Sequence, residues 1–202
     1  MLERSSVIGF KAGEGPSPVF CVKASGSSAA CGQFIGVTLM KILAILLMLL
    51  LALSAALVLT GQLGFLSGQP PVDLGVRNGR LKPPSATPNS VSSQADLYPD
   101  HPQRSYASIA PIKFTGDADQ AMQKLATLLK TNERTVLVMQ QPDYLYAQCS
   151  TPLLHFTDDV EFWLDRTAGV IQLRSASRMG HGDLGANRAR IEKLRAQFLS
   201  QN

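Results

Sequence analysis

Hydrophobic positions divide the chain into one long apolar run and a later region of periodic segments. Residues 42–59 (ILAILLMLLLALSAALVL) carry no charge and one polar side chain, Ser54. As a helix, eighteen residues rise about 27 Å, close to the thickness of the hydrocarbon core of a bilayer. A helix that is apolar on every face cannot lie on the surface of a small domain. The run therefore predicts a transmembrane helix within residues 40–61.

Charges near the run predict its orientation. Lys41 directly precedes it, and the next basic residue is Arg77. The positive-inside rule places the N-terminus in the cytoplasm and the C-terminal domain in the periplasm or another extracytoplasmic space. The run is either a retained single-pass anchor or a cleaved signal segment, and the poor cleavage sequence at residues 60–62 favours the anchor. We expect a cell-envelope protein with the membrane as partner through residues 42–59.

The segments on either side of the run differ in composition. Residues 1–39 mix Ser, Gly and Ala with scattered charges and show neither helical nor strand periodicity. Because Met40-Lys41 before an apolar run is typical of the start of an exported protein, we expect residues 1–39 to be a disordered or mis-assigned extension. Residues 62–104 are rich in proline, which disfavours helices and central strands. They form either a stiff linker or an ordered segment that wraps the domain.

Residues 105–202 have the periodicity of a globular domain. A short strand is predicted at Ile112–Phe114, a helix opens at Asp117, and a closing helix begins near Asp183. The four strands predicted between these helices are Thr135–Met139, Tyr144–Ser150, Asp159–Leu164 and Ile171–Ser177. This order predicts an α+β fold, a four-stranded antiparallel meander with two helices packed on one face, preceded by the single N-terminal transmembrane helix.

The alternation of apolar residues predicts the register of the last two strands. Pairing Leu164 with Ile171 keeps their apolar residues on one face, and Gly169 suits the left-handed position of the loop between them. The residues expected in the core are Leu125, Leu128, Val138, Leu145, Phe162, Ile171, Leu173, Leu194 and Phe198. The closing helix is expected to face inward with Leu184, Ile191, Leu194 and Phe198, and outward with Arg188, Arg190, Lys193 and Arg195.

The same register places charged residues on both faces of the sheet. Glu161 lies opposite Arg174 on the solvent face, as an ordinary exposed pair. Asp158 lies opposite Ser177 on the inner face, where an unpaired carboxylate costs several kcal/mol. We expect Asp158 to bind Ser177, Arg178, Arg188 or backbone N–H groups near residues 183–187, and so to clamp the sheet to the closing helix.

One polar cluster is the candidate site. It comprises Asp158, Asp159, Ser175, Ser177, Arg178, His181, Asp183, Asn187 and Arg188. An enzyme would use Asp158 or His181 as base and Arg178 or Arg188 to bind an anion. No nucleophile elbow, metal-binding His pair or Gly-rich phosphate loop accompanies them, which favours a protein that is not an enzyme.

Charge and cysteines narrow the function classes further. Residues 63–202 carry 15 Lys and Arg against 13 Asp and Glu, and this net +2 is too small for nucleic-acid binding. Three widely spaced cysteines exclude a zinc ribbon and a disulfide framework, and Cys149 lies on an apolar alternation typical of a small core residue. We expect no cofactor and no metal.

Two stretches carry a family resemblance. LGVRNGRLKPP at residues 74–84 continues into TPNSVSSQ at 87–94, and DDVEF at 158–162 precedes RSASR at 174–178. With Gly180, Asp183, Gly185, Asn187 and Arg188, these motifs resemble the domain-of-unknown-function family 1499. The resemblance spans residues 74–199 and implies an exported or membrane-anchored protein of the kind that bacteria and plastids have, with no established activity. It also implies that residues 81–94 are ordered against the domain.

One departure from the family pattern bears on chemistry. Many members carry two cysteines where this chain has Pro84 and Ser90. The resemblance implies that these cysteines form a disulfide in the relatives, since both are absent together here. Their absence weakens any redox or metal interpretation of this chain.

Three functions remain open. The first is a membrane-anchored, non-catalytic binding or assembly module with an unknown envelope partner. The second is a small-ligand or anion-binding domain using Asp158, Ser177, Arg178 and Asn187, and the third is a hydrolase built on the same residues. A deep pocket at these residues favours the second or third, and an exposed apolar patch favours the first.

Overall fold

The computed structural model describes residues 28–200, with side chains from residue 36 onward. Helix α1 runs from Ser28 to Gln62, and its residues 36–62 are long and apolar enough to cross a membrane. The expected extension at residues 1–27 lies outside the described part. Residues 28–39 were expected to be disordered, but they belong to α1. Extending an existing helix by a residue costs much less free energy than nucleating a new one.

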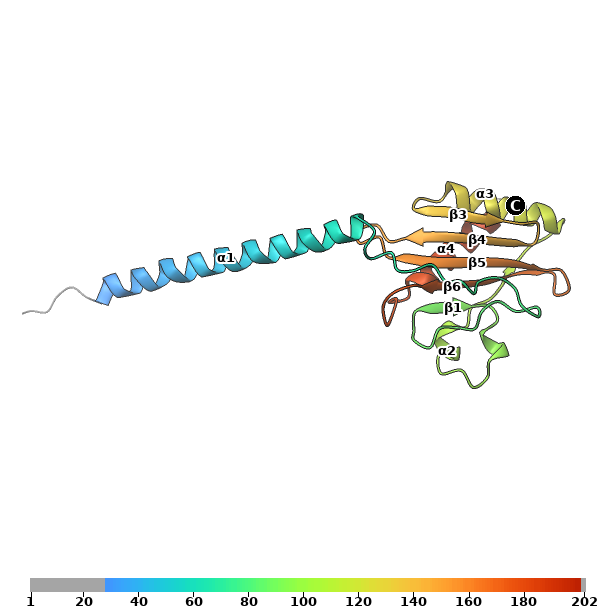
Figure 1. Ribbon diagram of the computed structural model, residues 1–202, viewed down its shortest axis with the longest axis horizontal. Coiled ribbons are helices and arrows are strands. Elements are labelled where there is room, and N and C mark those ends of the chain that lie inside the picture. Colours follow the sequence, from blue (N-terminus) through green and yellow to red (C-terminus); the bar gives the residue numbers. More distant parts are fainter. Residues whose placement is uncertain (1–27, 201–202) are drawn as a thin grey trace, which may run out of the picture. The chain divides into compact units, whose positions relative to one another are not determined.

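Ten further elements form the domain (Figure 1). They are β1 (Ser90–Ser92), η1 (Ala95–Leu97), α2 (Arg104–Ala107), β2 (Ile112–Lys113), α3 (Ala118–Thr131), β3 (Thr135–Gln140), β4 (Tyr144–Ser150), β5 (Thr157–Asp165), β6 (Val170–Ser177) and α4 (Ala186–Ser200). All strand pairs are antiparallel, and the sheet order is β1-β6-β5-β4-β3 with β2 also pairing with β6.

The predicted four-stranded meander is present as β3 to β6, but the sheet has six strands. Strand β1 adds to β6 by pairing Val91 with Ser175, and the short β2 pairs Ile112 with Ile171. Sequence reasoning missed β1 because three residues inside a proline-rich segment show too little alternation to read as a strand. The short helix α2 and the 3-10 turn η1 also add to the predicted count of helices.

The predicted register of β5 and β6 is confirmed. Leu164 pairs with Ile171, Glu161 with Arg174, and the loop between the strands ends at Gly169 with a φ of 66°. Asp117 caps α3 as expected, because its carboxylate accepts a hydrogen bond from the Gln120 N–H at 2.8 Å. Residues 152–154 form a turn in the loop between β4 and β5.

The inner face of the sheet packs on α3 and α4 and contains the main core. Side chains of β4, β5 and β6 form one buried cluster with both helices. Its largest members are Phe162, Phe198, Ile112, Leu125, Leu145, Leu164, Ile171, Leu173 and Ile191. Cys149 is buried there as predicted, and burial raises the pKa of its thiol. Val138 was wrongly placed in this core: it is 50% exposed, because Leu137 takes the inward position on β3 and the residue after it points to the opposite face.

The outer face of the sheet lies under residues 69–94, here called the wrapping segment. Leu81 is buried against Tyr144 and Tyr146, with Trp163 packed beside them. Near the two family positions without cysteine, the Ser90 hydroxyl accepts a hydrogen bond from the Ser85 N–H at 2.8 Å. The prediction that Glu161 and Arg174 face solvent is therefore wrong: the wrapping segment covers them, and their exposed fractions are 0% and 4%.

Candidate functional site

The predicted polar residues divide between two clusters on opposite faces of the sheet. Successive strand residues point to opposite faces, so Asp158 points inward and Asp159 outward. The inner cluster, beneath α4, comprises Asp158, Ser175, Ser177, Asp183, Asn187 and Arg190. The outer cluster, beneath the wrapping segment, comprises Tyr144, Tyr146, Asp159, Glu161, Arg174 and Arg178.

Asp158 is paired with Arg190 in the inner cluster. The carboxylate is buried on β5, and its Oδ2 accepts a hydrogen bond from the Arg190 guanidinium on α4. The expected clamp between sheet and closing helix is present, but none of the predicted partners supplies it. Arg190 was wrongly expected to face solvent. Arg190 follows the buried Asn187 by three residues, so the two side chains share one face of α4. This spacing is the feature of the sequence that could have predicted Arg190 as the partner of Asp158.

Asn187 joins three parts of the domain. Its Nδ2 donates to the Asn89 carbonyl at 3.0 Å and to the Ser177 hydroxyl at 3.1 Å, and its Oδ1 accepts from the Ser175 hydroxyl at 2.5 Å. Arg190 donates to the same Oδ1 at 2.8 Å. A fully buried amide must have its hydrogen bonds satisfied, and here both ends of the amide are. Asn187 thus ties α4 to β6 and to the wrapping segment.

Asp183 organises the start of α4. It accepts hydrogen bonds from the Gly185 and Asn187 N–H groups, each at 3.0 Å, and from the Tyr106 hydroxyl. Burial acts to raise the pKa of Asp183, but these hydrogen bonds hold it below its usual value. Arg188 donates to two backbone carbonyls near α2, at Tyr106 and Ser108. Both side chains therefore support the structure around α4.

The first pair of the outer cluster joins Asp159 and Arg178. Arg178 donates from Nε and from a terminal nitrogen to the two carboxylate oxygens at 2.9 and 2.7 Å. The Tyr146 hydroxyl donates to the same carboxylate at 2.6 Å. This bidentate geometry is the strongest arrangement of such a pair, and it uses both oxygens of Asp159.

The second pair of the outer cluster joins Glu161 and Arg174 less completely. Glu161 Oε1 accepts hydrogen bonds from the Tyr144 hydroxyl at 2.7 Å and from the Gly75 N–H at 2.8 Å. Its Oε2 has no hydrogen-bond partner among the described residues and lies 3.8 Å from the Arg174 guanidinium. Arg174 instead donates from Nε to the Pro83 carbonyl at 3.1 Å. The wrapping segment thus supplies one hydrogen bond to each member of the pair.

Burial changes the acid–base behaviour of the outer cluster. It raises the pKa of Tyr144 far above its ordinary value, and the neighbouring Glu161 carboxylate raises it further. Burial and the hydrogen bond to Asp159 likewise raise the pKa of Tyr146. For Arg174, burial lowers the pKa of the guanidinium while Glu161 opposes that change. Both tyrosines therefore stay neutral hydrogen-bond donors at physiological pH.

The residues considered for catalysis have separate partners. Asp158 binds Arg190, Arg178 binds Asp159, and Arg188 binds backbone carbonyls. His181 lies exposed in the loop between β6 and α4. The described part of the chain contains no group of three His, Cys, Asp or Glu side chains placed to hold a metal ion.

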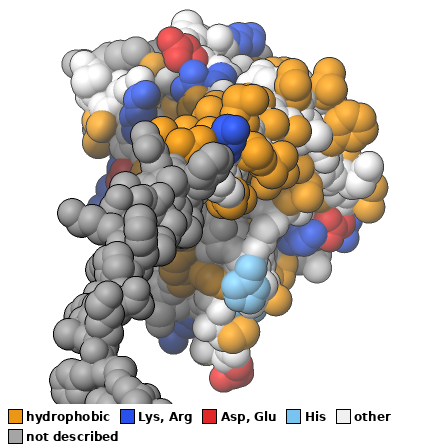
Figure 2. All heavy atoms as spheres, turned by 90° about the vertical axis from the view of Figure 1, so that its left-hand side faces the viewer, with side chains coloured by type: hydrophobic (Ala, Val, Ile, Leu, Met, Phe, Trp, Pro, Cys, Tyr) orange, Lys and Arg blue, Asp and Glu red, His pale blue; other side chains and the backbone are white. Residues whose placement is uncertain are grey.

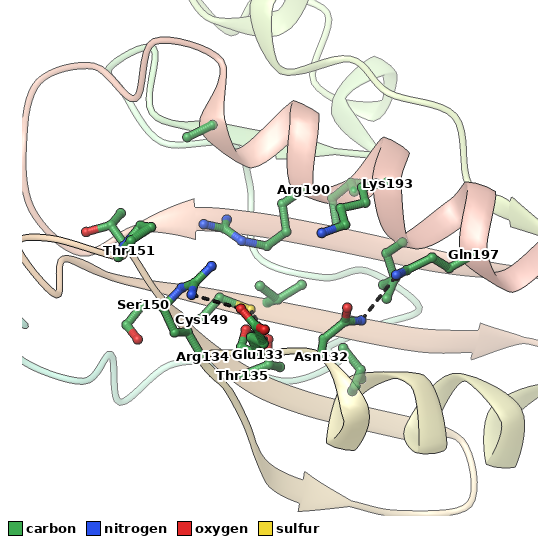
Figure 3. A pocket seen from close by; sticks show the side chains of 16 residues that line it. Asn132, Glu133, Arg134, Thr135, Cys149, Ser150, Thr151, Arg190, Lys193 and Gln197 are labelled. Atoms are coloured by element: carbon green, nitrogen blue, oxygen red, sulfur yellow. Dashed lines mark hydrogen bonds and ion pairs between the residues drawn. The ribbon is translucent and has the colours of Figure 1, made fainter.

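A cavity of about 270 Å³ lies between α4 and the ends of β3 and β4 (Figure 3). Arg190, Lys193 and Gln197 border it from α4, and Arg134 and Cys149 from the opposite side. Lys193 is exposed and has no ion-pair partner among the residues with described side chains. Ligand pockets commonly measure 300–1,000 Å³, so a cavity of about 270 Å³ lies below that range and has room only for a small ligand.

A second hollow, of about 370 Å³, borders the outer cluster under the wrapping segment. Its basic side chains already have carboxylate partners. Lys82 binds Asp73 at 2.7 Å, and Arg178 binds Asp159. The cavity beneath α4 thus has a lysine, Lys193, without an ion-pair partner among the described side chains, whereas Lys82 and Arg178 at the second hollow are already paired with carboxylates.

The comparisons with known proteins identify a family. The family described as "Protein of unknown function (DUF1499)" matches residues 80–198. No curated protein and no solved structure matches the chain. The matched range contains both polar clusters, the cavity and every strand of the sheet.

Proposed function

The chain belongs to the DUF1499 family, whose function is unknown, and from that premise we propose that it is a membrane-anchored, non-catalytic binding module of the cell envelope. In this proposal α1 is a retained single-pass anchor, with the N-terminus in the cytoplasm and the domain outside it. The domain holds an extended segment of an envelope partner along the free edge of β3.

The hydrogen bonding of the polar clusters supports a non-catalytic role. The carboxylates of Asp158, Asp159 and Asp183 are each bonded to a side chain or backbone group of the same domain. Groups held this way stabilise an arrangement of strands and helix, and an ion-pair network needs no ligand to account for it. The clusters are therefore assigned to the scaffold.

Strand β3 is the observation that carries the binding role. It is the last strand of the sheet, and among the described residues only β4 pairs with it. Its sequence, TVLVMQ, has no charge and no proline, and Val136 and Val138 are 62% and 50% exposed. Natural edge strands usually carry lysine or proline to prevent pairing, and β3 has only the register shift near Val138. Its outward backbone groups fit an added strand.

The experiment combines photo-crosslinking with an edge-blocking charge in cells. A photo-crosslinking residue at Val136 is expected to give one discrete adduct, and Val138→Lys is expected to remove it, because a charge on the edge opposes strand addition. The same crosslinker at Leu199, an exposed apolar position on α4, is the matched control and should give no adduct. Equal adducts at both positions, or none at Val136, would contradict the binding role. Release of the chain from membranes by alkaline carbonate would contradict the anchor.

The unpartnered Lys193 favours a second candidate, the binding of a small anion in the cavity beneath α4. Arg134 and Arg190 border the same cavity, although each has a carboxylate partner, Glu133 and Asp158. Inorganic phosphate is expected to raise the melting temperature of the full chain in detergent, and Lys193→Glu to abolish that increase. The control Lys113→Glu, on an exposed residue of β2 outside the cavity, should retain it. No increase in the unaltered chain rejects this candidate.

A further inference from the structure

The last turn of α1 contacts the loop between β4 and β5. The Gln62 side chain donates a hydrogen bond to the Leu153 carbonyl at 3.0 Å. A Cβ added at Gly61 would lie 2.6 Å from the Leu154 carbonyl oxygen, so the helix backbone directly touches this loop. Gly61 allows an approach that no larger residue permits.

The chain that leaves α1 also contacts the loop between β6 and α4. A Cβ at Gly68 would lie 2.8 Å from the Arg178 Cβ and 2.9 Å from the Met179 Cγ. Gly68 has a φ of 67°, which suits glycine. The two contacts place both loops beside residues 61–68. This segment starts in the last turn of the apolar helix and ends six residues after it.

These loops and the segment between them expose large apolar side chains. The exposed residues are Leu63, Phe65, Leu153, Met179 and Leu184. Figure 1 shows the loops after β4 and β6 at the same end of the sheet, and Figure 2 faces that end, where hydrophobic side chains make up much of the surface in view. We call these five residues the apolar rim.

We propose that the apolar rim inserts into the surface of the bilayer that α1 crosses, so that the domain lies on the lipid at the β4–β5 and β6–α4 loops. This inference rests on the proposed anchoring of α1. If the apolar helix ends at the bilayer surface near Gln62, a loop hydrogen-bonded to Gln62 lies at the same depth. Apolar side chains at that depth bury surface in the acyl and headgroup boundary, as interfacial anchors do.

The backbone at Leu184 supports this placement. The expectation that Leu184 faces inward is wrong, because α4 begins only at Ala186 and Leu184 lies fully exposed before it. Leu184 has a φ of 51°, a left-handed conformation that disfavours residues other than Gly, Asn and Asp. Asp183 and the start of α4 hold the loop in this conformation through the Gly185 N–H. An exposed leucine held in this conformation packs against no other described residue. Contact with lipid would bury its side chain.

The test measures lipid contact by fluorescence quenching in full-length protein. The chain has one tryptophan, so a Trp163→Phe background gives a dark protein into which single tryptophans are placed. Leu184→Trp and Leu153→Trp report on the rim. Thr167→Trp is the matched control, because Thr167 is exposed in the β5–β6 turn at the other end of β5 from the rim. The length of β5 separates this position from the rim by about 26 Å. Each variant is placed in nanodiscs of phosphatidylcholine with brominated or unbrominated acyl chains.

Brominated lipid is expected to reduce the emission of Leu184→Trp and Leu153→Trp roughly twofold, because an inserted side chain reaches about 5–10 Å into the lipid boundary. The Thr167→Trp emission should not change. Equal emission in both lipids at positions 153 and 184 overturns the inference and leaves the rim to a protein partner. Flotation of the unaltered chain with liposomes separates the two proposals: a chain that fails to float has no anchor, whereas one that floats with unquenched rim tryptophans is anchored without rim contact.

Discussion

The two faces of the sheet are buried by different means. The inner face packs apolar side chains such as Phe162 and Leu173 against α3 and α4, with Asp158–Arg190 as its ion pair. The outer face packs tyrosines and two carboxylate–arginine pairs beneath the wrapping segment. Apolar packing needs no particular orientation, whereas buried charges need specific partners. The inner face therefore contributes most of the stability, and the outer face fixes where one segment lies.

Removing the largest inner side chain should have the largest effect. Phe162→Ala deletes a fully buried ring beneath α3 and α4, and we expect a loss of about 4 kcal/mol in the free energy of unfolding. Urea denaturation of the full chain in detergent, followed by Trp163 fluorescence, measures it. Val136→Ala, on an exposed position of β3, should change the value by less than about 0.5 kcal/mol. Similar effects for the two variants would contradict the assignment of the core.

Breaking one ion pair of the outer cluster should lower the free energy of unfolding nearly as much as Phe162→Ala does. Glu161→Ala leaves the Arg174 guanidinium buried without its carboxylate, and we expect a loss of about 3 kcal/mol. The double variant Glu161→Gln/Arg174→Met removes both charges, keeps an acceptor for the Tyr144 hydroxyl and the Gly75 N–H, and should lie within about 1 kcal/mol of the unaltered chain. If the double variant is as unstable as the single one, the two charges do not act as a pair.

The inner ion pair should have a smaller effect. Asp158→Asn keeps the shape of the side chain but removes the charge facing Arg190, and we expect a loss of about 2 kcal/mol, seen as a lower melting temperature. Asp119→Asn breaks the exposed pair with Arg166 and should cost less than about 0.5 kcal/mol. Unchanged stability in Asp158→Asn together with a cellular defect would instead assign Asp158 to a ligand site.

Alkaline pH should destabilise the fold in part through the outer face. The pKa values of Tyr144 and Tyr146 are raised in the folded protein, so their protons remain there above pH 10 while the unfolded chain releases them. Their stabilisation is fully present below about pH 10 and falls by up to about 1.4 kcal/mol per pH unit for each tyrosine above it. Tyr144→Phe should reduce this slope. Asp158→Asn, which alters only the inner cluster, should leave the slope unchanged.

Sequence patterns predicted the parts of the fold that depend on neighbouring residues. The alternation in β5 and β6 gave the correct register, since a slip of one residue would reverse every side chain. Local alternation could not predict that the wrapping segment covers the outer face of the sheet. Glu161 looks solvent-exposed within its strand, and it is buried by Gly75, which lies 86 residues earlier. Contacts at such separations leave no local periodicity.

The polar residues that the sequence groups into one candidate site divide between the two faces of the sheet. Asp158 was expected to reach the closing helix, and it does, but its partner is Arg190. Several basic residues of α4 look equivalent in sequence, and only the spacing from Asn187 distinguishes Arg190. The division of DDVEF between two faces follows from strand alternation alone. The free edge at β3 was missed because the order of strands in a sheet depends on long-range pairing.

The pairing of β1 with β6 has a consequence for biosynthesis. Ser90 is made 86 residues before its partner Ala176. At a synthesis rate of about 5–20 residues per second, the wrapping segment waits roughly 4–17 s after translation for the strand it joins. In the proposed topology, in which the domain is exported, this segment leaves the translocation channel first, directly behind the apolar helix. Its prolines remove backbone donors, so it cannot form a stable strand with another nascent chain in that interval. The proline content therefore protects the wrapping segment until its partner strand has been made.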